Sequence, residues 1–283
     1  PFVLPPSLHR PMRCPTLLAL GLAFAVPVSA ALPAPDVDDG AISLPPGFRA
    51  LVYADNLVVG KRVGNTPEKL RGLAVAPNGD VYAKGKFGLI WALRDTNGDG
   101  RADTIKEFGP GGGGTHIAFH SSWLYHSSRT GVYRYPYTRG ELVPTGAMET
   151  IVRNLPAEKD HDAKAFAFDL YGGLLVEIGS PYNVFSDGDR RKGAKGKTDA
   201  EIAEFQRTYG GFWRFDANKP NQTQADGTRF STGHRHALAL AWHPVGRNFF
   251  MVQMGRDNMN VIAPDHYDEL DNAERVSEVM HLL

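Results

Sequence analysis

The sequence predicts an all-β fold of the β-propeller class, mainly because one phrase recurs along the chain. Each copy is a run of alternating apolar residues, a tight turn and a second short apolar run. The copies span residues 71–83, 114–126, 163–177 and 236–252. A further strand, opened by glycine, follows three of them at residues 88–94, 131–135 and 211–216. Period-two alternation broken by turns and repeated every ~45 residues is typical of propeller blades.

Composition agrees with this fold class. The chain has 283 residues, of which 42% are hydrophobic, and its 31 glycines and 20 prolines suit a turn-rich β protein. Its 31 basic and 31 acidic residues give a formal net charge of zero. Because no overall field attracts a polyanion, we expect no nucleic-acid partner.

The N-terminal residues have the pattern of an export signal. Met12 and Arg13 give a positive start, Leu17 to Val26 an apolar segment, and Val28 to Ala30 a small-residue cleavage site. The apolar segment is shorter than the ~20 residues of a membrane-spanning helix, so no transmembrane segment is expected after signal removal; a buried core helix is the alternative. The single cysteine, Cys14, lies within the signal. We therefore expect a periplasmic or secreted protein of bacterial type without disulfides.

The remaining chain is predicted to hold one domain. Residues 1–30 are upstream residues and signal peptide, 31–44 a linker, and 45–283 the propeller, with a first strand at residues 47–53. Residues 186–207 are predicted to be an insertion between two strands of one blade, with a solvated basic run and a short helix over residues 199–206.

The length of the chain predicts the number of blades: at ~45 residues per blade, residues 45–283 leave room for about four to five. Residues 277–283 end on an apolar run in which we expect no closing strand. A propeller protects its strand edges by closing the ring. The sequence therefore favours a propeller that is incomplete at the C-terminus over a closed four-bladed ring.

The spacing of acidic and amide residues at 95–103 predicts a candidate calcium loop. Carboxylate or amide oxygens occur at Asp95, Asn97, Asp99 and Asp103, with Gly100 at the turn, as in calcium-binding loops. The usual bidentate glutamate is replaced by Lys106. An Asx-rich hairpin between blade strands is the alternative, and the two remain open.

Two other clusters are predicted to carry no ligand chemistry. The spacing of His116, His120 and His126 along a strand, turn and strand does not converge on one metal. The glycines at 111–114 lack the Lys-Ser/Thr of a phosphate loop, so we expect a flexible loop there.

Several motifs together resemble one enzyme family. They are Ser43–Phe48, His161–Lys164, Gly179–Val184, Thr232–His236, Leu240–Pro244, and Gly255–Asp257 followed by Pro264–Asp265. In this order and spacing the chain, over residues 42–283, is similar to the pyrroloquinoline-quinone-dependent sugar dehydrogenases of the glucose/sorbosone dehydrogenase group. The resemblance implies a six-bladed propeller of which the last blade or more is absent.

The resemblance also implies roles for particular residues. His161 matches the base that takes the substrate hydroxyl proton, a task suited to an imidazole whose pKa is ordinarily near 6.5. Arg235 matches a cofactor-contacting arginine that stabilises negative charge on the quinone. Lys164 and His236 match further cofactor-binding positions, where the family usually has Arg and Asn.

The implied cofactors are pyrroloquinoline quinone and Ca²⁺. Gly255 and Arg256 match the positions whose backbone carbonyls hold the calcium, which polarises the quinone carbonyl. We therefore expect a quinoprotein that oxidises an aldose- or sorbosone-like alcohol or aldehyde by hydride transfer. A soluble or respiratory electron acceptor would reoxidise it.

Two other functions remain open because a propeller fold does not determine activity. A calcium-dependent lactonase-type hydrolase would need acidic and amide ligands on inner strands, where the sequence offers Asp169 and Glu177. A non-catalytic binding propeller would need none.

Overall fold

The computed structural model describes residues 32–157, 160–186, 190–274 and 278–283. The chain divides into two units, residues 1–32 and 33–283, and the description below concerns the second. The predicted export signal lies outside the described residues. No helix in the described ranges is both long enough and apolar enough to cross a membrane.

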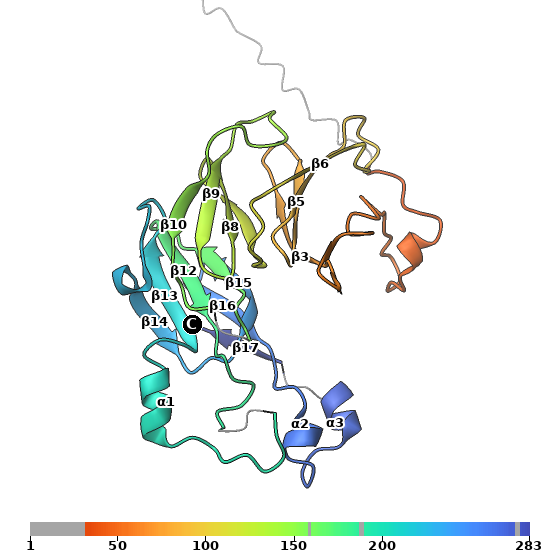
Figure 1. Ribbon diagram of the computed structural model, residues 1–283. Helices are drawn as coiled ribbons and strands as arrows, with labels where there is room; N and C mark the ends of the chain where they lie inside the picture. Colours follow the sequence, from red (N-terminus) through yellow and green to blue (C-terminus); the bar gives the residue numbers. More distant parts are fainter. Residues whose placement is uncertain (1–31, 158–159, 187–189, 275–277) are drawn as a thin grey trace, which may run out of the picture. The chain divides into compact units, whose positions relative to one another are not determined.

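The described chain contains four consecutive antiparallel sheets, which are the blades (Figure 1). The first is β3 (Leu70–Val75), β4 (Val81–Gly85), β5 (Ile90–Arg94) and β6 (Thr104–Phe108). The second is β7 (Ile117–His120), β8 (Trp123–Ser127), β9 (Val132–Pro136) and β10 (Glu149–Val152). The third is β11 (Phe166–Phe168), β12 (Gly173–Ile178), β13 (Gly211–Asp216) and β14 (Thr228–Thr232). The fourth is β15 (Ala237–His243), β16 (Asn248–Gln253) and β17 (Val279–Leu282).

The blades pack face to face through the alternating apolar residues of their strands. The first strands of neighbouring blades lie together, β3 against β7 and β11 against β15. Tyr82 and Leu124 belong to the core between the first two blades, and Tyr125 and Val176 to the core between the second and third. Because successive strand residues face opposite sides, one strand serves two interfaces. The predicted β-propeller class is confirmed, with four blades in the described chain.

The last residues form a strand that was not foreseen from the sequence. Val279–Leu282 form β17, which pairs with β16 as the third strand of the fourth blade. In the sequence, the apolar run was interpreted only as the lack of a strand that closes the ring, and that expectation stays a prediction. In the described residues, no strand of the first blade pairs with one of the fourth.

The predicted first strand at residues 47–53 is also wrong. Instead of pairing with a strand, Val52 N–H donates to the Asp36 carboxylate at 2.7 Å and Ala50 N–H to that of Asp39 at 2.9 Å. Asp36 precedes a 3₁₀ turn, η1 (Asp39–Ala41), and Asp39 is its first residue; both lie in the segment predicted to be a linker. The only regular pairing before the first blade is the hairpin of β1 (Arg62–Val63) and β2 (Thr66–Pro67), within the described residues.

The insertion in the third blade has the predicted position and helix. It connects β12 to β13 and contains α1 (Asp199–Phe205). Thr198 caps this helix, and its side chain and that of Glu201 form a capping box. The basic residues at 190–192 and 195 are exposed, as predicted. The corresponding connection in the fourth blade, between β16 and β17, contains α2 (Met259–Ile262) and α3 (Glu269–Glu274).

The four-glycine run is a packed segment rather than an open loop. Gly111 to Gly114 all have φ between +77° and +83°, a region that favours glycine. A side chain at Gly114 would overlap the carbonyl oxygen of Ser127, and one at Gly88 would overlap the Gly111 backbone. The glycines therefore allow close approach between the first two blades, which the expectation of a flexible loop did not anticipate.

Candidate functional site

His161 lies just before β11 and has a backbone conformation that is unusual for a residue with a side chain. Its φ is 53°, and such strained residues concentrate at functional sites. Its Nδ1 is 2.5 Å from the carbonyl oxygen of Ser180. Since a carbonyl only accepts, Nδ1 carries the proton and Nε2 keeps a free lone pair. The structure therefore gives His161 the tautomer that a base needs.

The surroundings of His161 explain the glycine of the predicted Gly179–Val184 motif. A Cβ at Gly179 would lie 2.5 Å from the carbonyl oxygen of His161 and 2.9 Å from its Cβ. The imidazole is largely buried, and burial lowers the pKa of His161, with the charges of Arg235 and His236 adding to the effect. The side chain is thereby kept neutral over a wider range of pH.

His236 lies beside His161 and is held by a buried acid. The two ring centroids are 5.0 Å apart, with the planes tilted by 32°. His236 Nδ1 is 3.1 Å from Glu177 Oε1, which also accepts from Ala237 N–H at 2.6 Å. Glu177 is fully buried, and within the described chain its Oε2 has no hydrogen-bond partner. The third and fourth blades thus meet at a carboxylate–imidazole pair.

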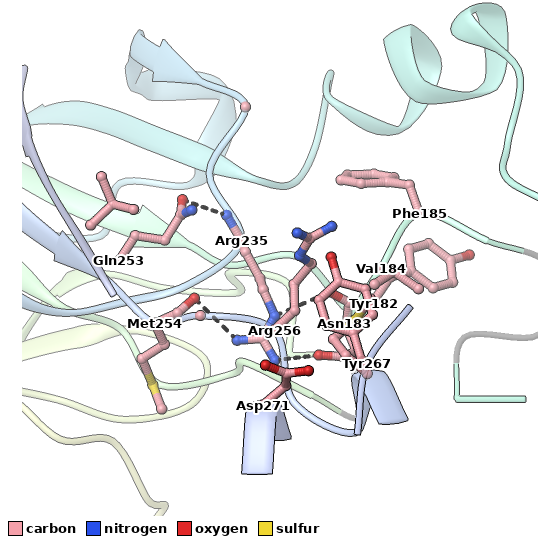
Figure 2. A pocket seen from close by; sticks show the side chains of 14 residues that line it. Tyr182, Asn183, Val184, Phe185, Arg235, Gln253, Met254, Arg256, Tyr267 and Asp271 are labelled. Atoms are coloured by element: carbon pink, nitrogen blue, oxygen red, sulfur yellow. Dashed lines mark hydrogen bonds between the residues drawn. The ribbon is translucent and has the colours of Figure 1, made fainter. Parts of the chain in front are cut away.

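Arg235 is anchored by the segments that follow β12 and β16 (Figure 2). Its guanidinium donates to the carbonyl oxygen of Asn183 at 3.1 Å, to Asn183 Oδ1 at 2.6 Å and to Asp257 Oδ1 at 2.8 Å. Its backbone accepts from Ser180 N–H at 2.8 Å and donates to Gln253 Oε1 at 3.1 Å. Ser180 contacts both predicted catalytic residues, so it links His161 to Arg235.

A cavity of about 470 Å³ opens beside Arg235. Its lining combines aromatic rings, basic side chains and the chain around the predicted calcium ligands, as Figure 2 shows. Among the lining residues are Tyr182, Phe185, Arg235, Gly255, Arg256 and Tyr267. The structure therefore gathers Arg235, Gly255 and Arg256 at one cavity. His161 and His236 adjoin it through Ser180 and through Met254, whose N–H donates to His236 O at 2.8 Å.

The family model described as TrAA12-like matches residues 71–277, which is well over half of the chain. The chain belongs to the TrAA12-like family. This is a family of pyrroloquinoline-quinone-dependent oxidoreductases, so the resemblance seen in the sequence is confirmed at that level. No curated protein sequence matches the chain.

Two solved structures support the fold of this TrAA12-like protein. The holo form of the pyranose dehydrogenase PQQ domain from Coprinopsis cinerea is 14% identical, with a TM-score of 0.54 over 67% of this chain and 44% of that one. An iodide structure of the carbohydrate-active enzyme of family AA12 from Trichoderma reesei is 17% identical, with a TM-score of 0.56 over 75% of this chain and 51% of that one. The chain thus spans about half the length of these neighbours.

Lys164, another predicted cofactor-binding residue of this TrAA12-like protein, lies behind the pair rather than in the lining of the cavity. Only 1% of the residue is exposed, and its Nζ donates to the carbonyl oxygen of Asp162 at 2.9 Å. Burial lowers the pKa of Lys164 to about 8, an effect opposed by the charge of Glu177. Lys164 thus lies outside the lining of the cavity, within electrostatic reach of Glu177, and its contact with a cofactor stays a prediction.

The candidate calcium loop lies apart from the cavity, between β5 and β6. Its side-chain oxygens accept from backbone N–H groups of the same loop: Asp95 from Gly98 at 2.7 Å and from Gly100 at 2.8 Å, and Asp99 from Arg101 at 2.9 Å. Asp103 accepts from Thr96, and Asn97 from Asp99 N–H. This is the geometry of an Asx-rich hairpin, and calcium binding there stays a prediction.

The histidines of the second blade have separate environments. His120 stacks on Phe168 at 4.1 Å, and His126 lies against Tyr133 and Tyr135. His116 is half-buried beside Phe166; desolvation lowers its pKa to about 4, and the charge of His236 adds to this.

Three residues of the site were not found from the sequence as partners. Asn183 and Asp257 fall within the quoted motifs, yet only the fold shows that both bind Arg235. Glu177 was noted only as an acid on an inner strand. Its partner His236 is 59 residues away, so no local spacing could indicate the pair.

Proposed function

We propose that this chain is part of an exported quinoprotein dehydrogenase that oxidises a sugar, an aldose- or sorbosone-like alcohol or aldehyde, by hydride transfer to pyrroloquinoline quinone. The observation that carries the proposal is that Ser180 links His161 to Arg235: its carbonyl lies against His161 Nδ1 and its N–H donates to the Arg235 carbonyl, while Arg235 lines the cavity. The PQQ domain of the Coprinopsis cinerea pyranose dehydrogenase, in its holo form, has the same fold. That likeness supports the cofactor class, while the substrate follows from the resemblance in sequence.

The cavity fits an anionic, planar quinone. The Arg235 guanidinium pairs with the Asp257 carboxylate, so an acidic group of the quinone would share or replace that partner. Arg256 adds a second positive charge, and the rings of Tyr182 and Tyr267 offer flat apolar surface. Arg235, Arg256 and His236 would hold the quinone, with Ca²⁺ on the backbone carbonyls of Gly255 and Arg256. When bound, the quinone supplies the hydride acceptor, and calcium increases its electrophilicity.

The chain's own residues supply the acid–base part. His161 accepts the proton of the substrate hydroxyl at Nε2, while Nδ1–H remains bonded to the Ser180 carbonyl. Arg235 stabilises negative charge that develops next to it. Electrons would leave through a soluble or respiratory acceptor.

The hydrolase alternative finds no support in the described residues. Asp169 binds the Arg214 guanidinium at 2.7 and 2.9 Å, and Glu177 binds His236. Nowhere in the described ranges do three acidic, histidine or cysteine side chains gather as a metal site.

The test is reconstitution of the full-length protein with pyrroloquinoline quinone and calcium. We expect aldose- or aldehyde-dependent reduction of an artificial dye, and quinone binding that Arg235→Ala weakens. Arg214→Ala is the matched control, because it removes a paired arginine outside the cavity and should leave quinone affinity unchanged. Failure of the protein to bind the quinone would favour the non-catalytic propeller.

A further inference from the structure

The buried pair of Glu177 and His236 has no role in the proton transfer proposed above. Glu177 uses one oxygen for both the His236 ring and the Ala237 N–H, at 3.1 and 2.6 Å. A buried carboxylate is costly unless its interactions offset its desolvation. Fold stability alone does not account for such a group next to a strained histidine, since an apolar residue of similar volume is often at least as stable at a buried ionic site.

The pair also determines what lies against the face of His161. The two imidazoles lie 5.0 Å apart, in loose face contact rather than in a hydrogen bond. Gly179, which has no side chain, lies close to both: a Cβ there would be 2.9 Å from His161 Cβ and 3.2 Å from His236 Nδ1. The His161 ring is therefore held by Ser180 at one edge and by His236 on its face.

We infer that Glu177 and His236 are positioning residues for His161: the carboxylate fixes the His236 ring, and that ring holds His161 with Nε2 available to accept a proton. The inference rests on the proposed function. It concerns the contacts of Glu177 with His236 and of His236 with His161, and it is separate from any contact of His236 with the quinone. The proton itself moves only from the substrate hydroxyl to His161 Nε2.

The electrostatic surroundings of His161 also favour its neutral form, which can accept a proton. Burial lowers the pKa of His161, and the charges of Arg235 and His236 add to this, against the opposing effect of the Ser180 hydrogen bond. Other ionisable groups near the cluster are Asp160, which acts on His161, His116, which interacts with His236, and Lys164, which interacts with Glu177; Asp162 and Arg129 act on Lys164.

The first experiment needs neither quinone nor sugar. The ring of His161 is titrated by NMR in protein labelled with ¹⁵N-histidine, and its signals are assigned from the spectrum of His161→Gln. In His236→Asn we expect the pKa of His161 to rise, because a burying ring and a like charge are both removed. Lys84→Met is the matched control: it also changes a fully buried ionisable residue, and it should leave the His161 titration in place.

The second experiment measures turnover in the reconstituted full-length protein. Glu177→Gln keeps the side-chain shape and an acceptor for Ala237 N–H but removes the charge that holds His236. We expect kcat to fall about tenfold or more, the scale of losses in general-base catalysis, with KM and the melting temperature nearly unchanged. The double variant Glu177→Gln/His236→Asn should be no slower than the slower single variant, because the two residues act as a unit.

An unchanged His161 titration in His236→Asn would overturn the inference, and so would fully additive losses of rate in the double variant. The two proposals fail separately. If the titration shifts but no sugar is oxidised, the positioning contact stands and the dehydrogenase proposal falls. If sugar is oxidised and Glu177→Gln keeps full kcat, the dehydrogenase proposal stands and the positioning role of Glu177 falls.

Discussion

Two buried polar clusters differ in how their charges are compensated. Between the third and fourth blades, Glu177 and His236 are 3.1 Å apart, and His236 is hydrogen-bonded through its backbone to Met254, which lines a cavity. Between the first two blades, Lys84 and His126 are equally buried, yet Lys84 Nζ and both ring nitrogens of His126 have no hydrogen-bond partner within the described chain. Burial of ionisable groups alone therefore does not identify a site. A site is identified by a buried ionisable group that has a hydrogen-bond partner and lies next to a cavity.

The cluster of Lys84 and His126, between the first two blades, consequently lowers the stability of the fold. Burial lowers the pKa of Lys84 to about 8 and that of His126 to about 3. In each case the folded state disfavours the charged form, which costs stability wherever the unfolded chain would be charged. If this contrast is correct, substitutions of Lys84 or His126 alter stability, and substitutions of Glu177 or His236 alter the chemistry.

The largest expected effect is on turnover. His161→Ala removes the base, and we expect kcat of the quinone-loaded full-length protein to fall by about 10²–10⁴. His126→Leu is the comparison, because this histidine is buried without hydrogen bonds and should be dispensable for rate. Steady-state dye reduction measures both. Equal losses in the two variants would abolish the distinction between the clusters.

The next effect concerns the stability of the first blade. The pKa of Lys84 falls from 10.5 to about 8 on folding, so the unfolded chain binds more protons between these values and stability rises with pH there. Below pH 8 the full penalty is present, at about 3 kcal/mol from ~1.4 kcal/mol per pKa unit. Lys84→Met should therefore raise the free energy of unfolding by up to about that amount at pH 7.

Denaturant melts of both proteins at pH 7 and above pH 10 check this sign. The advantage of Lys84→Met should shrink as the pH rises through 8 to 10.5, where wild-type Lys84 loses its proton in both states. A constant difference across this range would mean that packing, rather than charge burial, separates the two proteins.

Local sequence patterns predicted most of the blades, because alternation and turns are properties of neighbouring residues. The ranges 88–94, 131–135 and 211–216 contain β5, most of β9 and β13. The prediction of a strand at residues 47–53 was wrong because N–H groups in this segment bind the carboxylates of Asp36 and Asp39. The alternation of apolar residues carries no information about this tertiary contact. The site divides in the same way. Motif order located His161 and Arg235, while the partnership of Glu177 with His236 depends on how two blades meet.

The smallest expected effect belongs to the exposed loop between β5 and β6, which sharpens the contrast between buried and solvated charge. If Asp95 and its neighbours bind calcium in the native state only, free calcium at tenfold above Kd raises the free energy of unfolding by about 1.4 kcal/mol. Thermal melts in calcium and in chelator measure this gain. Asp95→Asn/Asp103→Asn is the control, because it removes two carboxylates of the loop and leaves the cavity at Arg235 intact. An equal calcium response in wild type and variant would assign the ion to another site and leave the loop as an Asx-rich hairpin, stabilised by its own backbone N–H groups.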